Sequence, residues 1–194
     1  MEAWFCHVPG LKVIAPATPH DAKGLLKSAI REPNPVIFIE AQLLYGTKGD
    51  VQEGEYTIPI GRAEVKRQGT DVTIVAYSKM LLQVMDAATE LAGQGIEAEV
   101  VDPRTLKPLD LNSLVASVKK TGKVVIVEEG WGFAGLGAQI AESLYSEAFD
   151  YLDAPIVRVT SEEVPMPYSR PLEDAAVPDK GRIVKAVTKL VSGS

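Results

Sequence analysis

The chain has 194 residues, of which 46% are hydrophobic, so it is long enough to bury a sizeable core. Its 26 acidic and 20 basic residues give a net charge of -6, and the basic residues are scattered, which argues against a nucleic-acid partner. Cys6 is the only cysteine, which excludes an internal disulfide and a multi-cysteine metal site. Short apolar runs and the absence of a signal-peptide pattern in residues 1–17 predict an intracellular protein without a membrane partner.

The chain opens with a predicted strand, helix and strand. Residues 11–15 and 36–40 predict the strands, and residues 20–31 predict the helix, with Thr18 as its cap before Pro19 at the first helical position. Two parallel strands and one helix cannot cover both faces and both edges of a buried sheet. We therefore expect this unit to end a larger domain or to dock on another subunit.

A polar, glycine-rich segment follows at residues 46–54, and we interpret residues 46–70 as a linker that ends in an extended stretch at a sheet edge or crossover. Beyond it, buried strands alternate with amphipathic helices. The predicted strands are 72–77, 98–102, 124–127 and 156–159, and the predicted helices are 80–92, 111–120, 136–146 and 180–191. This alternation predicts an α/β fold with a mainly parallel sheet and helices on both faces.

Residues 124–143 carry a motif with two competing interpretations. Gly130–Gly135 match the G-x-G-x-x-G fingerprint that holds a dinucleotide pyrophosphate on a helix N-terminus. However, Glu128–Glu129 would bring carboxylates close to that pyrophosphate, and the next strand ends in Thr160 rather than in a ribose-binding acid. We therefore favour glycines that permit a tight turn and close packing, and keep a dinucleotide-binding oxidoreductase as an alternative.

The other titratable residues predict no catalytic group. Adjacent strand residues point to opposite faces, so we interpret Glu128–Glu129 and Glu162–Glu163 as solvated strand ends rather than as acid–base pairs. We interpret His7 as a satisfied structural residue and His20 as a solvated residue of a first helical turn. Cys6 is expected to pack as a small apolar residue.

Seven segments, in order along the chain, resemble a known family. They are Ala3–Val13, Asp21–Leu25, Ala29–Arg31, Asn34–Val36, Ile58–Gly61, Asp153–Pro155 and Val164–Tyr168. Together they resemble the beta subunit of the thiamine-diphosphate-dependent 2-oxoacid dehydrogenases, which include the pyruvate, branched-chain and acetoin enzymes. The resemblance covers essentially the whole chain, and within this family we favour the pyruvate type without a residue that distinguishes the substrates.

The resemblance implies a division of the chain and of its chemistry. Residues 1–45 would be the C-terminal remnant of a pyrimidine-binding domain with a partial strand-helix-strand unit, residues 46–70 the linker and crossover, and residues 71–194 a transketolase-type C-terminal domain. The family's cofactor-activating glutamate and catalytic histidine would precede Met1, so no catalytic or cofactor-binding residue is assigned here. Thiamine diphosphate and magnesium would act in the parent complex, and we expect the chain alone to be inactive.

One metal site is implied by the resemblance. In some family members the positions matching Ala29, Ile30, Glu32 and Asn34 bind potassium, largely through main-chain oxygens. A helix C-terminus suits a cation because its last carbonyls lack helical partners and carry partial negative charge. Here a glutamate replaces the aspartate expected in the family, and a further ligand would come from the preceding part. Water on these carbonyls is the alternative.

The resemblance also implies partners. These are an alpha subunit, a second beta subunit and the acyltransferase core of the complex, with a homodimer expected in isolation. Residues 164–172 are apolar and braced by prolines, which indicates a contact surface. Asp174 and the end near Ser194 are docking candidates, with a solvent-exposed acid as the alternative. We expect the cytoplasm, or an organelle matrix or stroma, and keep a non-catalytic oligomerisation domain as a further alternative.

Overall fold

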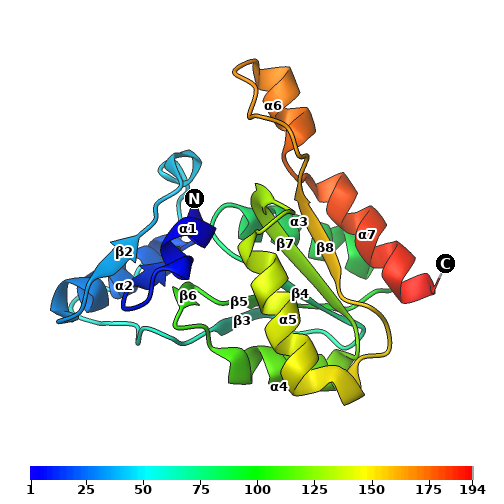
Figure 1. Ribbon diagram of the computed structural model, residues 1–194, viewed down its shortest axis with the longest axis horizontal. Helices are drawn as coiled ribbons and strands as arrows, with labels where there is room; N and C mark the ends of the chain where they lie inside the picture. The colour runs from blue at the N-terminus through cyan, green and yellow to red at the C-terminus, as the bar shows by residue number, and fades with distance from the viewer. Residues whose placement is uncertain (194) are drawn as a thin grey trace.

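A computed structural model describes residues 1–193 of the chain. Its helices are α1 (Glu2–His7), α2 (Pro19–Arg31), η1 (Gln42–Leu44), α3 (Met80–Gly93), α4 (Leu111–Thr121), α5 (Leu136–Ala148), η2 (Phe149–Tyr151), α6 (Arg170–Ala176) and α7 (Lys180–Ser192). Its strands are β1 (Lys12–Ile14), β2 (Val36–Phe38), β3 (Glu64–Arg67), β4 (Val72–Ala76), β5 (Ala98–Asp102), β6 (Thr105–Lys107), β7 (Val124–Trp131) and β8 (Val157–Ser161). Figure 1 shows a small N-terminal unit beside a larger C-terminal one.

The larger unit is a five-stranded sheet in the order β3-β5-β4-β7-β8. All neighbouring pairs are parallel except β3 with β5, which is antiparallel. Helices α3 and α7 pack on one face, and α4 and α5 pack on the other, each face with its own apolar core. This confirms the predicted α/β architecture. β3 lies within residues 46–70, so the end of the proposed linker is itself an edge strand.

The N-terminal unit is a three-stranded sheet in the order β2-β1-β6, with α2 beside it. Thr18 caps α2 as predicted, because its side chain accepts a hydrogen bond from the Asp21 N–H at 3.1 Å. The unit predicted with two strands has a third one within the chain, since β6 pairs antiparallel with β1. A strand of three residues, immediately after β5, is too short to produce a recognisable hydrophobic period. Among residues 1–193, β2 pairs only with β1, so its outer edge stays open.

A buried ion cluster joins the two units. Asp21 of α2 has no exposed surface, and its carboxylate lies 2.6 Å from the Lys66 ammonium and 3.1 Å from the Arg104 guanidinium. Arg104 also lies 3.0 Å from Glu64. Burial opposes ionisation of Asp21, but the hydrogen bonds from Lys66, Thr18 and Arg104 outweigh it and lower its pKa. The cluster therefore fixes how α2 sits on β3 and on the turn after β5.

Asp102, at the end of β5, is a second buried carboxyl near this cluster. Its Oδ1 accepts a hydrogen bond from the Arg104 N–H at 2.9 Å, whereas its Oδ2 is buried without a partner among residues 1–193. Burial raises the pKa of Asp102 from 3.8 to about 7, against the opposing effect of the Arg104 N–H and Lys66. Deprotonation therefore places an incompletely paired charge in the interior.

Asp102 predicts a pH dependence of stability that an asparagine would remove. A carboxyl with a raised folded-state pKa stabilises the fold fully below its unfolded pKa, and this contribution is lost as pH rises through about 7. The stability of Asp102→Asn relative to the parent chain should therefore increase as the pH rises from about 4 to about 8. The urea midpoint of both proteins at each pH measures this difference. A constant difference across that range would show that Asp102 does not titrate in this window.

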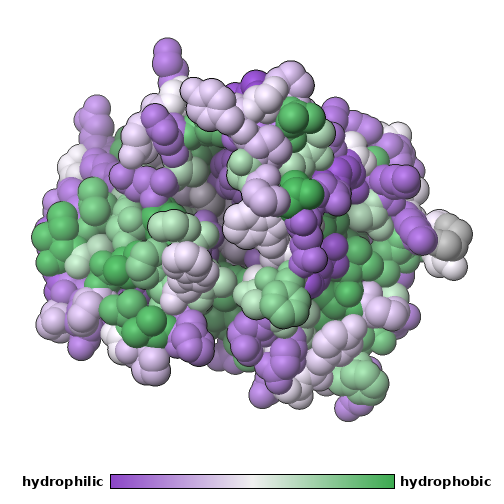
Figure 2. Space-filling model, turned by 45° about the horizontal axis from the view of Figure 1, so that its top comes forward, coloured by the Kyte–Doolittle hydropathy of each residue, from purple (hydrophilic) through white to green (hydrophobic). Residues whose placement is uncertain are grey.

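Large apolar side chains are exposed on the N-terminal unit (Figure 2). They are Met1, Trp4, Val8, Leu26, Ile30, Leu43 and Tyr45. Exposed large apolar side chains that gather on one unit indicate an interaction surface. No helix in the described part of the chain is both long and apolar enough to cross a bilayer.

Candidate functional site

A hollow of about 760 Å³ lies where α1 meets the loop between β7 and α5. It is lined by Met1, Glu2, Ala3, Trp4, His7, Tyr77, Glu128, Gly130, Trp131, Phe133, Ala134, Gly135 and Leu136. β4 and β7 are neighbours in the sheet. The strand that follows β4 along the chain, β5, lies on one side of this pair, whereas the strand that follows β7, β8, lies on the other side. The hollow thus lies outside the carboxyl ends of β4 and β7, at the switch point where open parallel sheets usually bind ligands.

Glu128 is the buried acid of this hollow, and only 1% of its surface is exposed. Its Oε2 accepts hydrogen bonds from the Gly137 N–H at 3.0 Å and from the Tyr77 hydroxyl at 3.2 Å. Its Oε1 is buried and has no partner among the described residues. Burial raises the pKa of Glu128, and the two hydrogen bonds only partly oppose this effect.

The solvated interpretation of Glu128 was therefore wrong. β7 runs four residues beyond the predicted end of its strand, so Glu128 is an interior residue rather than a strand end. Glu129 points to the opposite side, as adjacent strand residues must, and its carboxylate lies 2.5 Å from the Lys79 ammonium. Glu162 and Glu163 are exposed as predicted.

Two glycines at the start of α5, Gly135 and Gly137, make room for this carboxylate. A Cβ atom on Gly137 would lie 2.4 Å from Glu128 Oε1, and one on Gly135 would lie 2.4 Å from the Trp131 carbonyl oxygen. Because the Gly137 N–H already binds Glu128, an internal carboxylate occupies the N-terminus of α5, where a dinucleotide phosphate would bind. The geometry favours the packing interpretation of Gly130–Gly135 over the dinucleotide one.

Three other titratable residues that the sequence singles out are His7, His20 and Cys6. His7 is exposed at the rim of the hollow, and His20 stacks on Tyr56 with ring centroids 4.9 Å apart. His20 Nδ1 lies 3.7 Å from the Asp21 carboxylate. Cys6 is partly buried against the core, and burial raises the pKa of its thiol to about 11.

Comparison with known proteins decides the family. Residues 61–183 match the family described as transketolase, C-terminal domain, and residues 1–48 match the transketolase pyrimidine binding domain. The chain belongs to the transketolase C-terminal domain family. Glu128 therefore lies in the part that matches the transketolase C-terminal domain, whereas the α1 residues that line the hollow lie in the part that matches the pyrimidine binding domain.

Two curated relatives of this chain are pyruvate dehydrogenase E1 beta subunits. The chain is 50% identical over 192 residues to the mitochondrial pyruvate dehydrogenase E1 component subunit beta of Dictyostelium discoideum, covering 97% of this chain and 54% of the relative. It is 50% identical over 188 residues to the corresponding subunit of Rickettsia felis, covering 97% of this chain and 58% of the relative. The chain thus spans about half the length of these relatives.

Solved structures agree with the fold. A structure described as a split gene transketolase, inactive beta4 tetramer, superposes with a TM-score of 0.79 at 30% identity, covering 98% of this chain and 60% of that one. A transketolase mutant from Pichia stipitis superposes with a TM-score of 0.66 at 17% identity, covering 98% of this chain and 26% of that one. Because the Pichia stipitis transketolase is only 17% identical to this chain, its similarity supports the fold alone.

The four residues predicted to bind potassium lie close together at the C-terminal end of α2. Glu32 N–H donates to the Ala29 carbonyl at 3.3 Å, and Asn34 Nδ2 donates to the Glu32 carboxylate at 2.6 Å. The Glu32 carboxylate also lies 2.6 Å from the Lys12 ammonium, and these two hydrogen bonds lower its pKa to about 2. The carboxylate charge is thus compensated by Lys12, and the Ile30 side chain is exposed.

The predicted docking region of this transketolase-type chain lies on and before α6, which projects from the body of the molecule in Figure 1. Its apolar side chains Val164, Met166, Tyr168 and Leu172 are exposed. Asp174 is exposed and pairs with Arg170 at 2.9 Å. Ser194 lies outside the described residues, so its predicted docking role has no structural description here.

Proposed function

We propose that this chain is the C-terminal part of the beta subunit of a 2-oxoacid dehydrogenase first component, of the pyruvate type. The names of the relatives from Dictyostelium and Rickettsia support this assignment. In the assembled enzyme a 2-oxoacid is decarboxylated on thiamine diphosphate with magnesium, and the acyl group passes to lipoamide. The chain itself contributes assembly and docking. Its proposed cellular location is the cytoplasm, or an organelle matrix or stroma.

The observation that carries this proposal is the exposed apolar surface of the N-terminal unit. Trp4 and Ile30 are each 76% exposed, and the outer edge of β2 has no strand partner among residues 1–193. Such a surface is stabilised by a partner that covers it. The partners we propose are the remainder of a pyrimidine-binding domain, an alpha subunit and a second beta subunit. The acyltransferase core is proposed to dock near Asp174, and the isolated chain to form homodimers.

Calorimetric titration tests what this chain binds by itself. With thiamine diphosphate and magnesium, and separately with NAD, we expect no saturable heat, because the described residues provide neither a metal cluster of acids and histidines nor a free helix N-terminus at α5. Saturable NAD binding that Gly132→Val abolishes would instead establish the dinucleotide-binding alternative.

The domain limits and the potassium site belong to the same proposal. We place the remnant of the pyrimidine-binding domain at residues 1–45, the linker at 46–70 and the C-terminal domain at 71–194. Potassium is proposed to bind main-chain oxygens near Ala29 and Ile30, with Glu32 and Asn34 beside it. If so, the thermal midpoint should be higher in potassium chloride than in tetramethylammonium chloride, and an equal midpoint in both salts would exclude it.

A further inference from the structure

Strand β8 forms an open edge of the five-stranded sheet. Among the described residues it pairs only with β7, in parallel, and no strand lies on its other side. An edge strand presents backbone N–H and C=O groups that can pair with an added strand. In Figure 1, β8 borders the sheet beside α7.

Side chains occupy the two ends of this edge and leave its middle open. The Ile156 N–H donates to the Tyr145 hydroxyl at 2.9 Å, and Arg182 Nη2 donates to the Thr160 carbonyl at 2.8 Å. Backbone groups of a strand alternate in direction with a period of two residues. The N–H and C=O of Arg158 therefore point the same way, toward the open side and between these two contacts.

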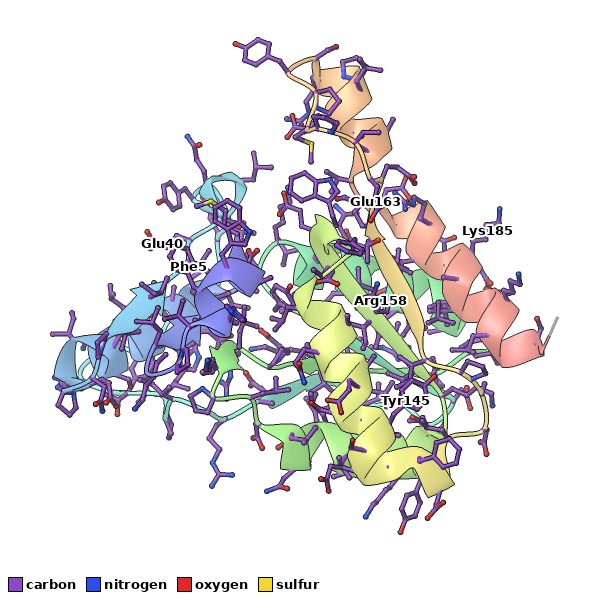
Figure 3. The ribbon with its side chains drawn as sticks, viewed as in Figure 1. Phe5, Glu40, Tyr145, Arg158, Glu163 and Lys185 are labelled. Carbon is purple, nitrogen blue, oxygen red and sulfur yellow. The ribbon has the colours of Figure 1, made fainter. Side chains whose placement is uncertain are left out.

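A hollow lies on each face of this edge. One, of about 820 Å³, is formed with α5 and includes Tyr145. The other, of about 780 Å³, is formed with α7 and includes Lys185. Arg158 and Thr160 line both hollows, and Figure 3 labels Tyr145, Arg158 and Lys185 around the strand. A strand added along β8 would send alternate side chains into the two hollows.

The charge of this surface is opposite to that of the chain as a whole. The basic side chains that line the two hollows are Arg158, Arg182, Lys185 and Lys189. Their only acidic counterparts in the linings are Glu142 and Asp153, although the chain carries a net charge of -6. The Nη1 atoms of Arg158 and Arg182 are buried without an acceptor among residues 1–193. Arg182 also pairs with Glu162 at 3.1 Å, but the basic side chains still outnumber the acidic ones on this surface.

We propose that the open edge of β8 binds an extended, acidic segment of a partner protein by strand addition. The backbone of Arg158 pairs with the segment, and acidic side chains enter the basic hollow beside α7. A second copy of the chain is a poorer occupant, because its own β8 edge would bring four further basic side chains to the same surface.

The test is binding of a short fluorescent peptide of alternating glutamate and valine, followed by fluorescence anisotropy. We expect saturable binding, weakened about tenfold by Lys185→Glu and far less by Lys48→Glu, which makes the same charge change on an exposed residue of the 46–54 loop. An N-methylated peptide, which cannot pair as a strand, should lose affinity by about tenfold or more. Hydrogen exchange should show new protection at the Arg158 amide.

Three results would overturn the proposal. The first is absence of saturable binding by the acidic peptide to the folded chain. The second is equal binding of the N-methylated peptide, which would indicate charge attraction without strand addition. The third is self-association that protects the Arg158 amide and that excess peptide does not displace, because the occupant would then be a second copy.

Discussion

Replacing Asp21 with alanine should lower the free energy of unfolding by about 3–5 kcal/mol, because it takes the fully buried carboxylate away from two largely buried cations. The Asp21 side chain is fully buried, and those of Lys66 and Arg104 are only 14% and 10% exposed. Removing Asp21 leaves Lys66 and Arg104 largely desolvated with Glu64, a side chain that is 43% exposed, as their shared carboxylate. Urea denaturation followed by circular dichroism measures the loss directly.

A surface ion pair provides the control for Asp21. Glu90 lies 2.7 Å from Lys180, but the two side chains are 42% and 49% exposed. Water solvates both ions when the pair is broken, so Glu90→Ala should cost less than about 1 kcal/mol. Equal, small losses for Asp21→Ala and Glu90→Ala would show that the cluster between α2 and β3 does not hold the two units together.

Gly69→Ala should destabilise the chain by about 3 kcal/mol or more, since the new methyl group has no space. Its Cβ would lie 2.2 Å from the Ala98 carbonyl carbon and 2.2 Å from the Glu99 nitrogen, which are backbone atoms of β5. Backbone in a paired strand cannot move aside as a flexible side chain can. The expected result is a much lower urea midpoint, with loss of the antiparallel β3–β5 edge.

Gly93→Ala is the matched substitution without a clash. Gly93 is the last residue of α3, and a Cβ there would meet nothing within 4 Å. Alanine is the better helix former, so this variant should keep or slightly raise the urea midpoint. Similar midpoints for the two variants would mean that β5 does not pass as close to Gly69 as described.

The regular part of the fold could be predicted from sequence because its signals are strong. Val124–Val127 is a continuous apolar run and Val72–Ala76 is interrupted only by Thr73, and the Thr18 and Asp110 caps mark where α2 and α4 begin. Segments of six or seven residues, such as α1 and α6, lack the length to show a helical period. β6 was missed for the same reason, and its pairing with β1 depends on a contact distant in the sequence.

The candidate site was less predictable than the fold. Glu128 and Glu129 are adjacent in sequence, yet one is buried against Gly137 and the other reaches Lys79. Their environments differ because of the length of β7 and the position of α5. Two adjacent glutamates in a sequence predict neither of these features. The nearest sequence signal is the run of glycines. It indicates that another group packs close to the backbone, but it does not identify that group.

The central claim is that this chain works as part of a larger beta subunit, and a chimera tests it most directly. The chain replaces the matching segment of the Rickettsia felis beta subunit, which is co-expressed with its alpha subunit, and pyruvate-dependent release of carbon dioxide is measured with thiamine diphosphate and magnesium. We predict that the chimera is active and that the chain alone is not. Decarboxylation by the chain alone, or an assembled chimera without decarboxylation, would contradict the account.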